Sequence, residues 1–299
     1  MSFGLTESQR SVRDTFARFT NEQIIPRAAE LDESHEFPHQ LFGMLGELGF
    51  FGIRYPESVG GSGMDLTSFC LALEEVARGS LSLAGAVAMQ SLMGTDFIYR
   101  LGSELHHQEL FMPALDGKKI GAICMTEPDA GSDLGGIRTT AKNVEGGYLI
   151  NGQKMWVTSA PLADFFTVFA KAGEEQKLTI FVVERGMEGV HVGRPIEKMG
   201  VWALPTSEVA FDDCFVPASH RLSKEEGDGE GHLRKLLAEI RIITGAMAVG
   251  IARAALDSAV SYAGQRKQFG KPINRFQAIQ LKLAEMGTDL EAARQLVYF

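Results

Sequence analysis

The hydrophobic pattern of this 299-residue chain changes twice, and the two changes limit its fold more than any other feature. Apolar residues recur at helical spacing up to about Gly117, fall into short runs of β-formers as far as about Pro217, and return to helical spacing after residue 231. The expected strands include residues 148–150, 165–169, 178–183 and 209–211. Short strands between turn signals are typical of a small barrel or sandwich. The sequence therefore predicts an α+β, multi-domain chain with an all-α domain at 1–118, a β-barrel domain at 119–226 and an α-helical bundle at 227–299.

Local signals mark several element boundaries. Thr6 and Gln9 fit a capping box that starts the first helix, and Pro26 should kink or shorten that helix. The dipeptide Asn151-Gly152 follows an apolar run and is a strong hairpin signal. We therefore expect an interruption of the first helix near Pro26 and a tight turn at residues 151–152.

The C-terminal region is predicted to form two long helices. Residues 233–263 contain no Pro and have a dense apolar pattern, and a second helix starts near Arg275 and is still running at Phe299. Two long helices do not close a bundle, whereas four do. We therefore expect the helical bundle to be incomplete in this chain.

Composition and charge exclude several classes of function. The chain is 45% apolar and 22% charged, as in ordinary globular proteins, and its net charge of −9 argues against binding nucleic acid or an anionic membrane surface. No apolar run approaches the roughly 18 residues of a membrane-spanning helix, and the N-terminus lacks the pattern of a signal peptide. The three cysteines are far apart and the histidines are scattered, so we expect no metal site and a cytoplasmic location.

Three short segments carry the functional signal. Residues 122–133 (AICMTEPDAGSD) combine small residues, hydroxyls and a turn that contains Pro; residues 154–159 (KMWVTS) and 266–272 (RKQFGKP) follow. In this order, the segments resemble those of the acyl-CoA dehydrogenase family of flavoenzymes, and the resemblance runs from about Leu5 to Phe299. It implies a helical, a β and a second helical domain, followed in the family by further helices and a tail that this chain lacks.

The resemblance implies that the protein binds FAD. The isoalloxazine ring is flat and polar along one edge, so a site for it needs donors along that edge and an aromatic or apolar wall beside one face. Thr126 and Thr158 offer hydroxyls and Trp156 offers the wall, although each residue alone would also suit an ordinary β core. The resemblance places a hydrogen bond from Thr158 to flavin N5. By the same resemblance, the FAD contacts in the β domain are Ile123, Met125, Thr126, Gly131, Ser132, Trp156 and Thr158.

The third segment implies assembly. Arg266 corresponds to a family Arg that reaches the FAD pyrophosphate of a neighbouring subunit, a task for which the bidentate guanidinium is suited. Taken alone, Arg266, Lys267 and Lys271 fit a solvated helix end better than a phosphate site. The other FAD contacts implied for this region are Gln268, Phe269, Phe276 and Gln277. The resemblance therefore implies a homo-oligomer, with a homotetramer expected.

Dehydrogenation of an acyl thioester requires a base for the α-proton, a hydride acceptor, and donors that hold the thioester carbonyl. In the family the base is a Glu, found either beyond the position of Phe299 or directly before Arg241. Ile240 occupies the second position, and Glu239 is one residue away, which turns a helical side chain by about 100°. We therefore assign no catalytic residue within the chain and expect the base Glu beyond Phe299.

The substrate contacts that map by resemblance are Ser132 and Arg241. Leu204 stands where the family has a Ser that contacts the CoA arm, and Ala238 stands where the family often has Asp. These two departures favour an unusual acyl-CoA, or an acyl group on a carrier protein, as the substrate.

The implied activity is that of an FAD-dependent acyl-CoA dehydrogenase of fatty acid or amino acid catabolism, which introduces an α,β double bond and passes electrons to an electron-transfer flavoprotein. Two alternatives stay open: a flavin monooxygenase of the same fold, and a non-catalytic flavin-binding scaffold. Glu127, Asp129 and Asp133 resemble ligands of a hard cation, but we interpret them as turn and cap residues.

Overall fold

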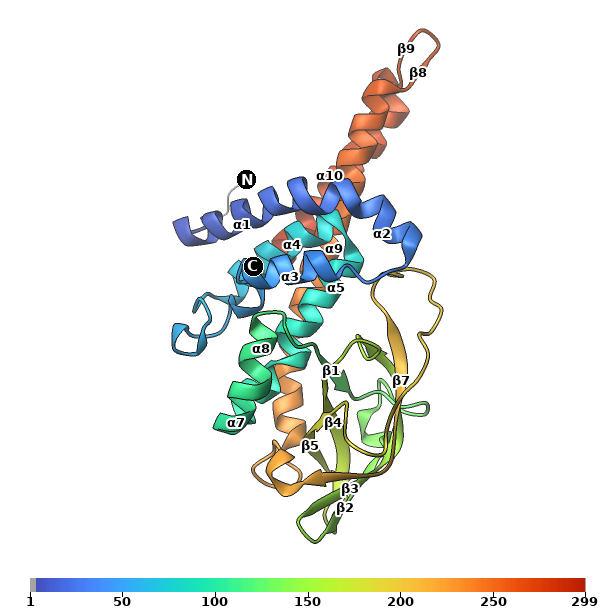
Figure 1. Ribbon diagram of the computed structural model, residues 1–299. Helices are drawn as coiled ribbons and strands as arrows, with labels where there is room; N and C mark the ends of the chain where they lie inside the picture. Colours follow the sequence, from blue (N-terminus) through green and yellow to red (C-terminus); the bar gives the residue numbers. More distant parts are fainter. Residues whose placement is uncertain (1–3, 299) are drawn as a thin grey trace. The chain divides into compact units, whose positions relative to one another are not determined.

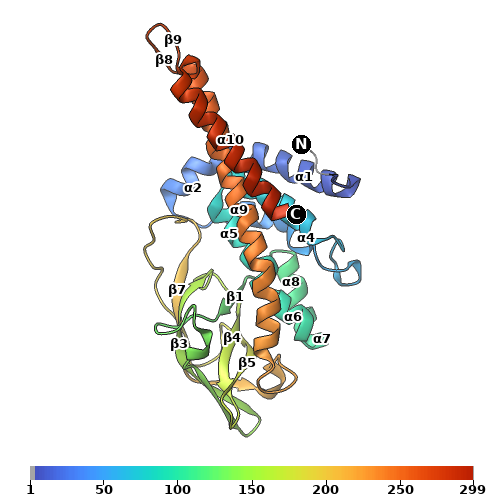
Figure 2. The same ribbon diagram turned by 180° about the vertical axis from the view of Figure 1, so that it is seen from behind.

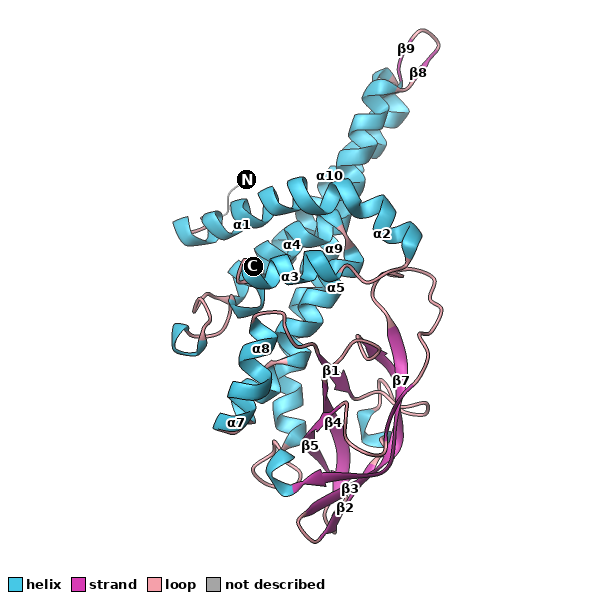
Figure 3. Ribbon diagram, in the orientation of Figure 1, coloured by secondary structure: helices cyan, strands magenta, loops and turns pink. Residues whose placement is uncertain are grey.

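The computed structural model describes residues 4–298, which form two compact units assembled from separate stretches of the chain. The first unit comprises Met1–Ala29, Asp65–Ala84 and Ile240–Phe299, and the second comprises Glu30–Met64 and Gly85–Glu239. Figure 1, coloured along the sequence, shows that the large sheet belongs to the middle of the chain, and Figure 3 distinguishes its strands from the helices. Each compact unit therefore contains residues that are far apart in sequence.

The first unit is helical. Its principal helices are α1 (Glu7–Phe19), α4 (Leu66–Gly79), α9 (Gly229–Gln265, from Ile240 onward) and α10 (Gln277–Tyr298), with a small β8–β9 hairpin (Lys267–Gln268 and Lys271–Pro272) and η9 (Ile273–Arg275) between the last two. The predicted capping box is confirmed, because the Thr6 hydroxyl accepts from the Gln9 N–H while the Gln9 side chain accepts from the Thr6 N–H. After Phe19 the helix passes through the π-helical turn η1 (Thr20–Ile24) and the 3₁₀ turn η2 (Ile25–Arg27), as expected near Pro26.

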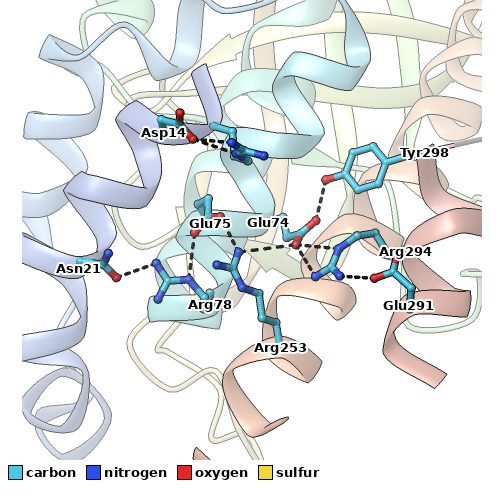
Figure 4. A network of polar contacts seen from close by, with 10 residues as sticks. Asp14, Asn21, Glu74, Glu75, Arg78, Arg253, Glu291, Arg294 and Tyr298 are labelled. Carbon is cyan, nitrogen blue, oxygen red and sulfur yellow. Dashed lines mark hydrogen bonds and ion pairs between the residues drawn. The ribbon is translucent and has the colours of Figure 1, made fainter. Parts of the chain in front are cut away.

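Two adjacent carboxylates on α4 are buried at the centre of the first unit (Figure 4). Arg253 of α9 lies 2.5 Å from Glu75, and Arg294 of α10 lies 3.0 Å from Glu74. The Tyr298 hydroxyl donates to the second oxygen of Glu74 over 2.8 Å. A buried carboxylate is tolerated only when it is paired and hydrogen-bonded, so α4 needs both later helices to bury these side chains.

The second unit combines short helices with the large sheet. Its helical elements are α2 (Ala28–Ser34), α3 (His39–Glu47), η3 (Phe50–Gly52), η4 (Glu57–Val59), α5 (Leu81–Ala88), η5 (Met89–Gly94), α6 (Asp96–Leu101), α7 (Glu104–His106), η6 (His107–Phe111), α8 (Met112–Leu115), η7 (Leu134–Gly136) and η8 (Ala218–His220). The unit boundaries fall inside α2, α5 and α9. Two of these elements, η5 and η6, are π-helical turns.

One helical run in the described part of the chain is long and apolar enough to cross a membrane, judged by length and composition. It covers Leu81–Leu101 with a mean hydropathy of 1.2. Within the structure, 78% of its most apolar window is buried, as in the core helix of a globular protein. The expectation that the chain has no membrane span stays a prediction.

The large sheet has seven strands: β1 (Gly121–Cys124), β2 (Thr140–Val144), β3 (Gly147–Thr158), β4 (Phe165–Ala172), β5 (Lys177–Glu184), β6 (Val190–Val192) and β7 (Thr206–Pro217). The strand order is β1-β4-β2-β3-β7-β6, with β5 paired to β4, and the curled sheet is visible from both sides in Figures 1 and 2. Strand β4 runs parallel to β1 and β2 and antiparallel to β5. Every residue of β4 except Lys171 is buried, as expected for a strand covered on both faces.

The hairpin prediction at Asn151-Gly152 is wrong. Both residues lie inside the long strand β3, and the turn between β2 and β3 is at Gly146, where φ is +81°. The Asn151 side chain instead pairs with Asp213, which forms a bulge in β7: its amide donates to the Asp213 carboxylate and its carbonyl accepts the Asp213 N–H, each over 2.9 Å. Gly is required at position 152 because a Cβ there would lie 2.3 Å from Thr139 Oγ1.

Candidate active site

The first two sequence motifs meet in the second unit. Residues 122–133 begin in β1 and continue into the turn that follows it, and residues 154–159 close β3. The Met155 N–H donates to the Thr126 carbonyl over 2.8 Å, which joins the two segments directly. The sequence prediction that these segments act together therefore has a structural basis.

A bulge in β3 displays the Trp156 side chain. Lys154 pairs with Val209 and Val157 pairs with Ser207, so Met155 and Trp156 together oppose one residue of β7. Trp156 has a φ of +59°, which is unusual for an aromatic residue and is sustained only where the surroundings fix it. Its side chain is 57% exposed. The bulge thus presents a large flat ring at the surface, directly after the residue that bonds the Thr126 carbonyl.

A buried ion pair lies beneath this surface. The Lys154 ammonium is fully buried and lies 2.7 Å from Glu127 Oε1, and Glu127 also accepts from the backbone N–H groups of Arg138 and Thr139. Burial lowers the pKa of Lys154, and contact with Glu127 opposes this. Burial alone would raise the pKa of Glu127, but the three hydrogen bonds outweigh it and hold that pKa below its usual value.

Glu127 is a turn residue, as the sequence predicts, but it also forms the buried ion pair. Glu127 and Ala130 do close a tight backbone turn, and Asp133 caps η7 through the Gly135 N–H. The ion pair of Glu127 with Lys154 was not predicted. The inward direction of Lys154 could have been read from the alternation along β3, where Tyr148 and Ile150 are also buried. Among the described residues, no cluster of three His, Cys, Asp or Glu side chains could hold a metal ion.

The donors and the wall that a flavin requires are present at this surface. Thr126 and Thr158 are half-buried, and in the described part of the chain neither hydroxyl has a hydrogen-bond partner. Trp156, two residues before Thr158, offers its exposed ring. Gly131 and Ser132 are exposed in the turn after β1, where backbone N–H groups are accessible to an anion. These residues fit a ligand with a polar edge, a flat aromatic face and a phosphate group.

Two of the expected contacts lie deeper. Ile123 belongs to β1 and its side chain is only 6% exposed, whereas Met125 is half-buried. Ile123 therefore supports the sheet and can meet a surface ligand chiefly through its backbone.

The third motif forms a separate hairpin in the first unit. Phe269 and Gly270 both have positive φ, +50° and +78°, as a two-residue turn between strands requires. Phe269 is 92% exposed, and its ring lies 6.1 Å from that of Phe276. The hairpin brings together the five C-terminal residues that the sequence predicted, all exposed or half-buried: Arg266, Gln268, Phe269, Phe276 and Gln277.

Arg241, the expected substrate contact, and Glu239, which we do not assign as the base, differ in their surroundings. Arg241 is exposed and forms no ion pair among residues 4–298, so it is available to a ligand. Glu239, in the second unit, is paired with Arg54, and Arg100 lies 3.9 Å from its other oxygen. The interpretation of Glu239 as a salt-bridging residue is confirmed. Ile240 is half-buried and has no titratable group.

Leu204, which stands where the family has a Ser that contacts the CoA arm, is a buried packing residue. It is 5% exposed, and a Cβ on Gly85 would come within 2.8 Å of it. The Lys198 ammonium donates to the Leu204 carbonyl over 2.9 Å, and the indole N–H of Trp202 donates to the Lys198 carbonyl. The loop is thereby closed on itself, with an apolar group where the family has a hydroxyl.

A second polar cluster in this unit has no sequence signal. The Tyr55 hydroxyl contacts the Ser91 carbonyl at 2.9 Å and the Thr95 hydroxyl at 2.8 Å, and Asp96 pairs with Arg100 at 2.7 Å. Burial raises the pKa of Asp96, and the hydrogen bond from Arg100 opposes this. Roughly three helical elements lie between Tyr55 and its partners Ser91 and Thr95 in the sequence. No local sequence pattern could therefore have revealed the cluster.

Three family descriptions together match nearly the whole chain. "Acyl-CoA dehydrogenase, N-terminal domain" matches residues 6–118, "middle domain" matches 122–214, and "C-terminal domain" matches 227–299. The chain belongs to the acyl-CoA dehydrogenase family. The predicted family, the order of helical, sheet and helical regions, and the enzyme class are therefore confirmed.

Similar proteins and solved structures support the same family assignment. Benzylmalonyl-CoA dehydrogenase of Aromatoleum aromaticum is 72% identical over 298 residues, which is 100% of this chain and 79% of that protein. A chain of the structure "Electron transferring flavoprotein of Acidaminococcus fermentans: Towards a mechanism of flavin-based electron bifurcation" matches at 37% identity with a TM-score of 0.95, over 100% of this chain and 79% of that one. The acyl-CoA dehydrogenase complexed with FAD from Bacillus anthracis matches at 33% identity with a TM-score of 0.92, over 100% and 52%. The protein is an FAD-dependent acyl-CoA dehydrogenase.

Proposed function

We propose that this protein oxidises an arylmethyl-substituted malonyl-CoA, with benzylmalonyl-CoA as the reference substrate. The observation that supports the proposal is the 72% identity to benzylmalonyl-CoA dehydrogenase across the full length of the chain. The departure at Leu204 agrees with it, because an apolar side chain replaces a polar contact on the CoA side and indicates a thioester outside the common straight-chain set.

The proposed substrate suits the reaction. Its α-carbon carries a hydrogen next to the thioester, and its β-carbon is a CH₂ attached to the aromatic ring, so the new double bond is conjugated with both groups. FAD, when bound, accepts the β-hydrogen as a hydride. Removal of the α-proton requires a base, which we place in the Glu expected beyond Phe299, because Ile240 cannot titrate and Glu239 is held by Arg54.

The residues proposed to hold FAD are those that the sequence identified. The half-buried hydroxyls of Thr126 and Thr158 would bond the polar edge of the ring, and the exposed Trp156 would cover one face. Gly131 and Ser132 present backbone N–H groups to a phosphate or ribose. Ser132 and Arg241 are the proposed contacts of the thioester substrate. Ile123 and Met125 complete the set on the sheet side.

We further propose that the hairpin at residues 266–277 contacts the FAD of a second copy, so that the active protein is a homo-oligomer, with a tetramer expected. In its support, Phe269 is 92% exposed and Arg266 forms no ion pair among the described residues, which suits an aromatic and a cation awaiting a partner. We propose an electron-transfer flavoprotein as the electron acceptor, supported by the Acidaminococcus structure, and a cytoplasmic location.

Anaerobic stopped-flow mixing tests the substrate proposal. Full-length protein loaded with FAD is mixed in turn with benzylmalonyl-CoA, butyryl-CoA and isovaleryl-CoA while the visible absorbance of the flavin is followed. Benzylmalonyl-CoA should bleach the flavin fastest, by at least about tenfold, which corresponds to roughly 1.4 kcal/mol of discrimination. Faster bleaching by butyryl-CoA would show that the substrate assignment is wrong.

A further inference from the structure

The Lys154 ammonium has a complete set of protein acceptors. It lies 2.7 Å from Glu127 Oε1, 2.6 Å from the Phe169 carbonyl and, more weakly, 3.4 Å from the Met125 carbonyl. An ammonium group has three N–H donors, so all three are used within the protein. The side chain is also fully buried. Lys154 therefore cannot contact a ligand directly, and any effect on one must pass through the residues that it holds.

The acceptors of Lys154 lie on both sides of Thr126. Met125 precedes Thr126 and Glu127 follows it, while the Thr126 carbonyl itself accepts the N–H of Met155. Two consecutive residues of β3 thus bond three consecutive residues of the segment after β1. This arrangement fixes the direction in which the Thr126 side chain leaves the backbone.

The same contacts fix the start of the β3 bulge. The bulge begins directly after Lys154, and Trp156 within it has the unfavourable φ of +59°. Such a conformation costs about 1–3 kcal/mol in general and persists only where neighbouring contacts over-determine it. Lys154 and the Met155 N–H are the contacts that hold the residues immediately before Trp156. The direction of the exposed ring therefore depends on them.

Glu127 extends the arrangement to a third segment. Its carboxylate accepts the backbone N–H groups of Arg138 and Thr139, at 2.6 and 3.0 Å, where the chain enters β2. All these bonds are made by protein groups alone, so the arrangement exists before any cofactor binds. A pre-formed site does not have to be ordered by its ligand, which raises affinity.

We propose that Lys154 and Glu127 are positioning residues for FAD, which clamp the Thr126 segment to the Trp156 bulge and so set the spacing between the flavin's edge donors and its aromatic wall. The inference rests on the proposed FAD contacts of Thr126, Trp156 and Thr158. It predicts that loss of the pair changes flavin geometry and affinity rather than only the stability of the sheet.

The test uses Lys154→Met and Glu127→Gln in the full-length protein. Met keeps the length and apolar stem of Lys and leaves Glu127 its two backbone donors, whereas Gln keeps an acceptor but removes the charge. Two variants serve as controls: Asp129→Asn removes an exposed charge two residues from Glu127, and Phe181→Leu weakens the core of the same sheet without touching the pair. Each is measured for thermal stability, FAD dissociation constant and visible spectrum of the bound flavin.

A fourth measurement reports on Trp156 itself. Residues 1–299 contain two Trp, so Trp202→Phe, together with Phe at any Trp beyond Phe299, leaves Trp156 as the sole indole whose emission FAD can quench. In this background, Lys154→Met should raise the FAD dissociation constant by about 10- to 100-fold, by analogy with the loss of metal affinity when groups that orient metal ligands are removed. Quenching of the Trp156 emission at saturating FAD should also decrease. Asp129→Asn and Phe181→Leu should stay within about threefold of the parent.

The outcomes distinguish failure of the proposed positioning role of Lys154 and Glu127 from failure of the proposed FAD site. If Lys154→Met binds FAD no more weakly than a Phe181→Leu variant of equal stability, with unchanged quenching, the pair only stabilises the sheet and the proposal is wrong. If Lys154→Met does not fold, Glu127→Gln decides by the same criteria. If the parent binds FAD but Trp156 emission is not quenched, the flavin lies elsewhere, and the proposed contacts fail together with the clamp.

Discussion

Glu239 and Arg54 form an ion pair within the second unit, although 185 residues separate them in sequence. Arg100 lies 3.9 Å from the other oxygen of Glu239 and is itself paired with Asp96. A general base must lie within reach of the substrate proton and have no competing role, and the Glu239 side chain is already engaged by Arg54.

The first prediction follows from this pair. Glu239→Gln in the full-length enzyme should leave substrate reduction of the flavin within roughly a factor of ten of wild type, whereas loss of a general base costs about 10²–10⁴. Stopped-flow reduction with saturating substrate measures the difference. A loss of several orders of magnitude, with FAD still bound, would show that Glu239 is the base.

The second prediction concerns the C-terminal hairpin. Arg266→Ala should weaken FAD binding by about tenfold or more, because it removes a bidentate donor proposed to hold pyrophosphate. Lys282→Ala is the matched control, since Lys282 is also an exposed cation in the first unit but lies on α10, outside the hairpin. Equilibrium dialysis against FAD compares the two. Equal losses would count against a phosphate contact.

The third prediction concerns the buried carboxylates of α4. Glu74→Gln should lower the free energy of unfolding by about 3 kcal/mol, because it breaks a buried ion pair and leaves Arg294 with a weaker partner. Glu291→Gln removes the other partner of Arg294, which is 35% exposed, and should cost less than about 1 kcal/mol. Urea unfolding followed by circular dichroism measures both. Equal costs would contradict the role given to burial.

The fourth prediction is a pH dependence. His106 is 4% exposed, and burial first, then the nearby His220, lowers its pKa from the ordinary 6.5. The unfolded chain therefore binds a proton in a range where the folded ring does not, so the free energy of unfolding should fall as pH drops below 6.5 toward the folded pKa. His106→Gln, which has no titratable group, should lose less stability between pH 7.5 and 5.5. An identical loss in both proteins would refute the assignment.

The sequence predicted those features whose signals are local. The Thr6 capping box, the interruption at Pro26 and the strands at residues 165–169 and 178–183 depend on nearest neighbours in sequence, and the structure contains them. The functional motifs were recognised by order and residue type. Their joining through the Met155 N–H and the Thr126 carbonyl could not be read, because it depends on the pairing of distant strands.

The errors came from long-range partners. Asn151-Gly152 has the composition of a turn, but Asp213 in β7 offers the Asn151 side chain two hydrogen bonds, and the strand continues through it. Glu74 lies on a helix whose pattern alone places no partner near it; its partners are 220 and 224 residues away. Lys154 belongs to one predicted motif and Glu127 to another, where the sequence predicts only a turn residue. Nothing in the sequence indicates that the two side chains form a buried ion pair.

The long separation between Glu74 and its partners sets an order of events during synthesis. A ribosome releases α4 long before α10, and until Arg294 and Tyr298 have emerged, Glu74 lacks its two hydrogen-bond partners, whereas Glu75 already has Arg78 three residues away on α4. Burying Glu74 earlier would leave uncompensated charge in an apolar interior. Glu74 therefore stays hydrated while the sheet-containing unit is translated, and it can be buried with both partners only after the turn of α10 that carries Arg294 and Tyr298 has left the exit tunnel.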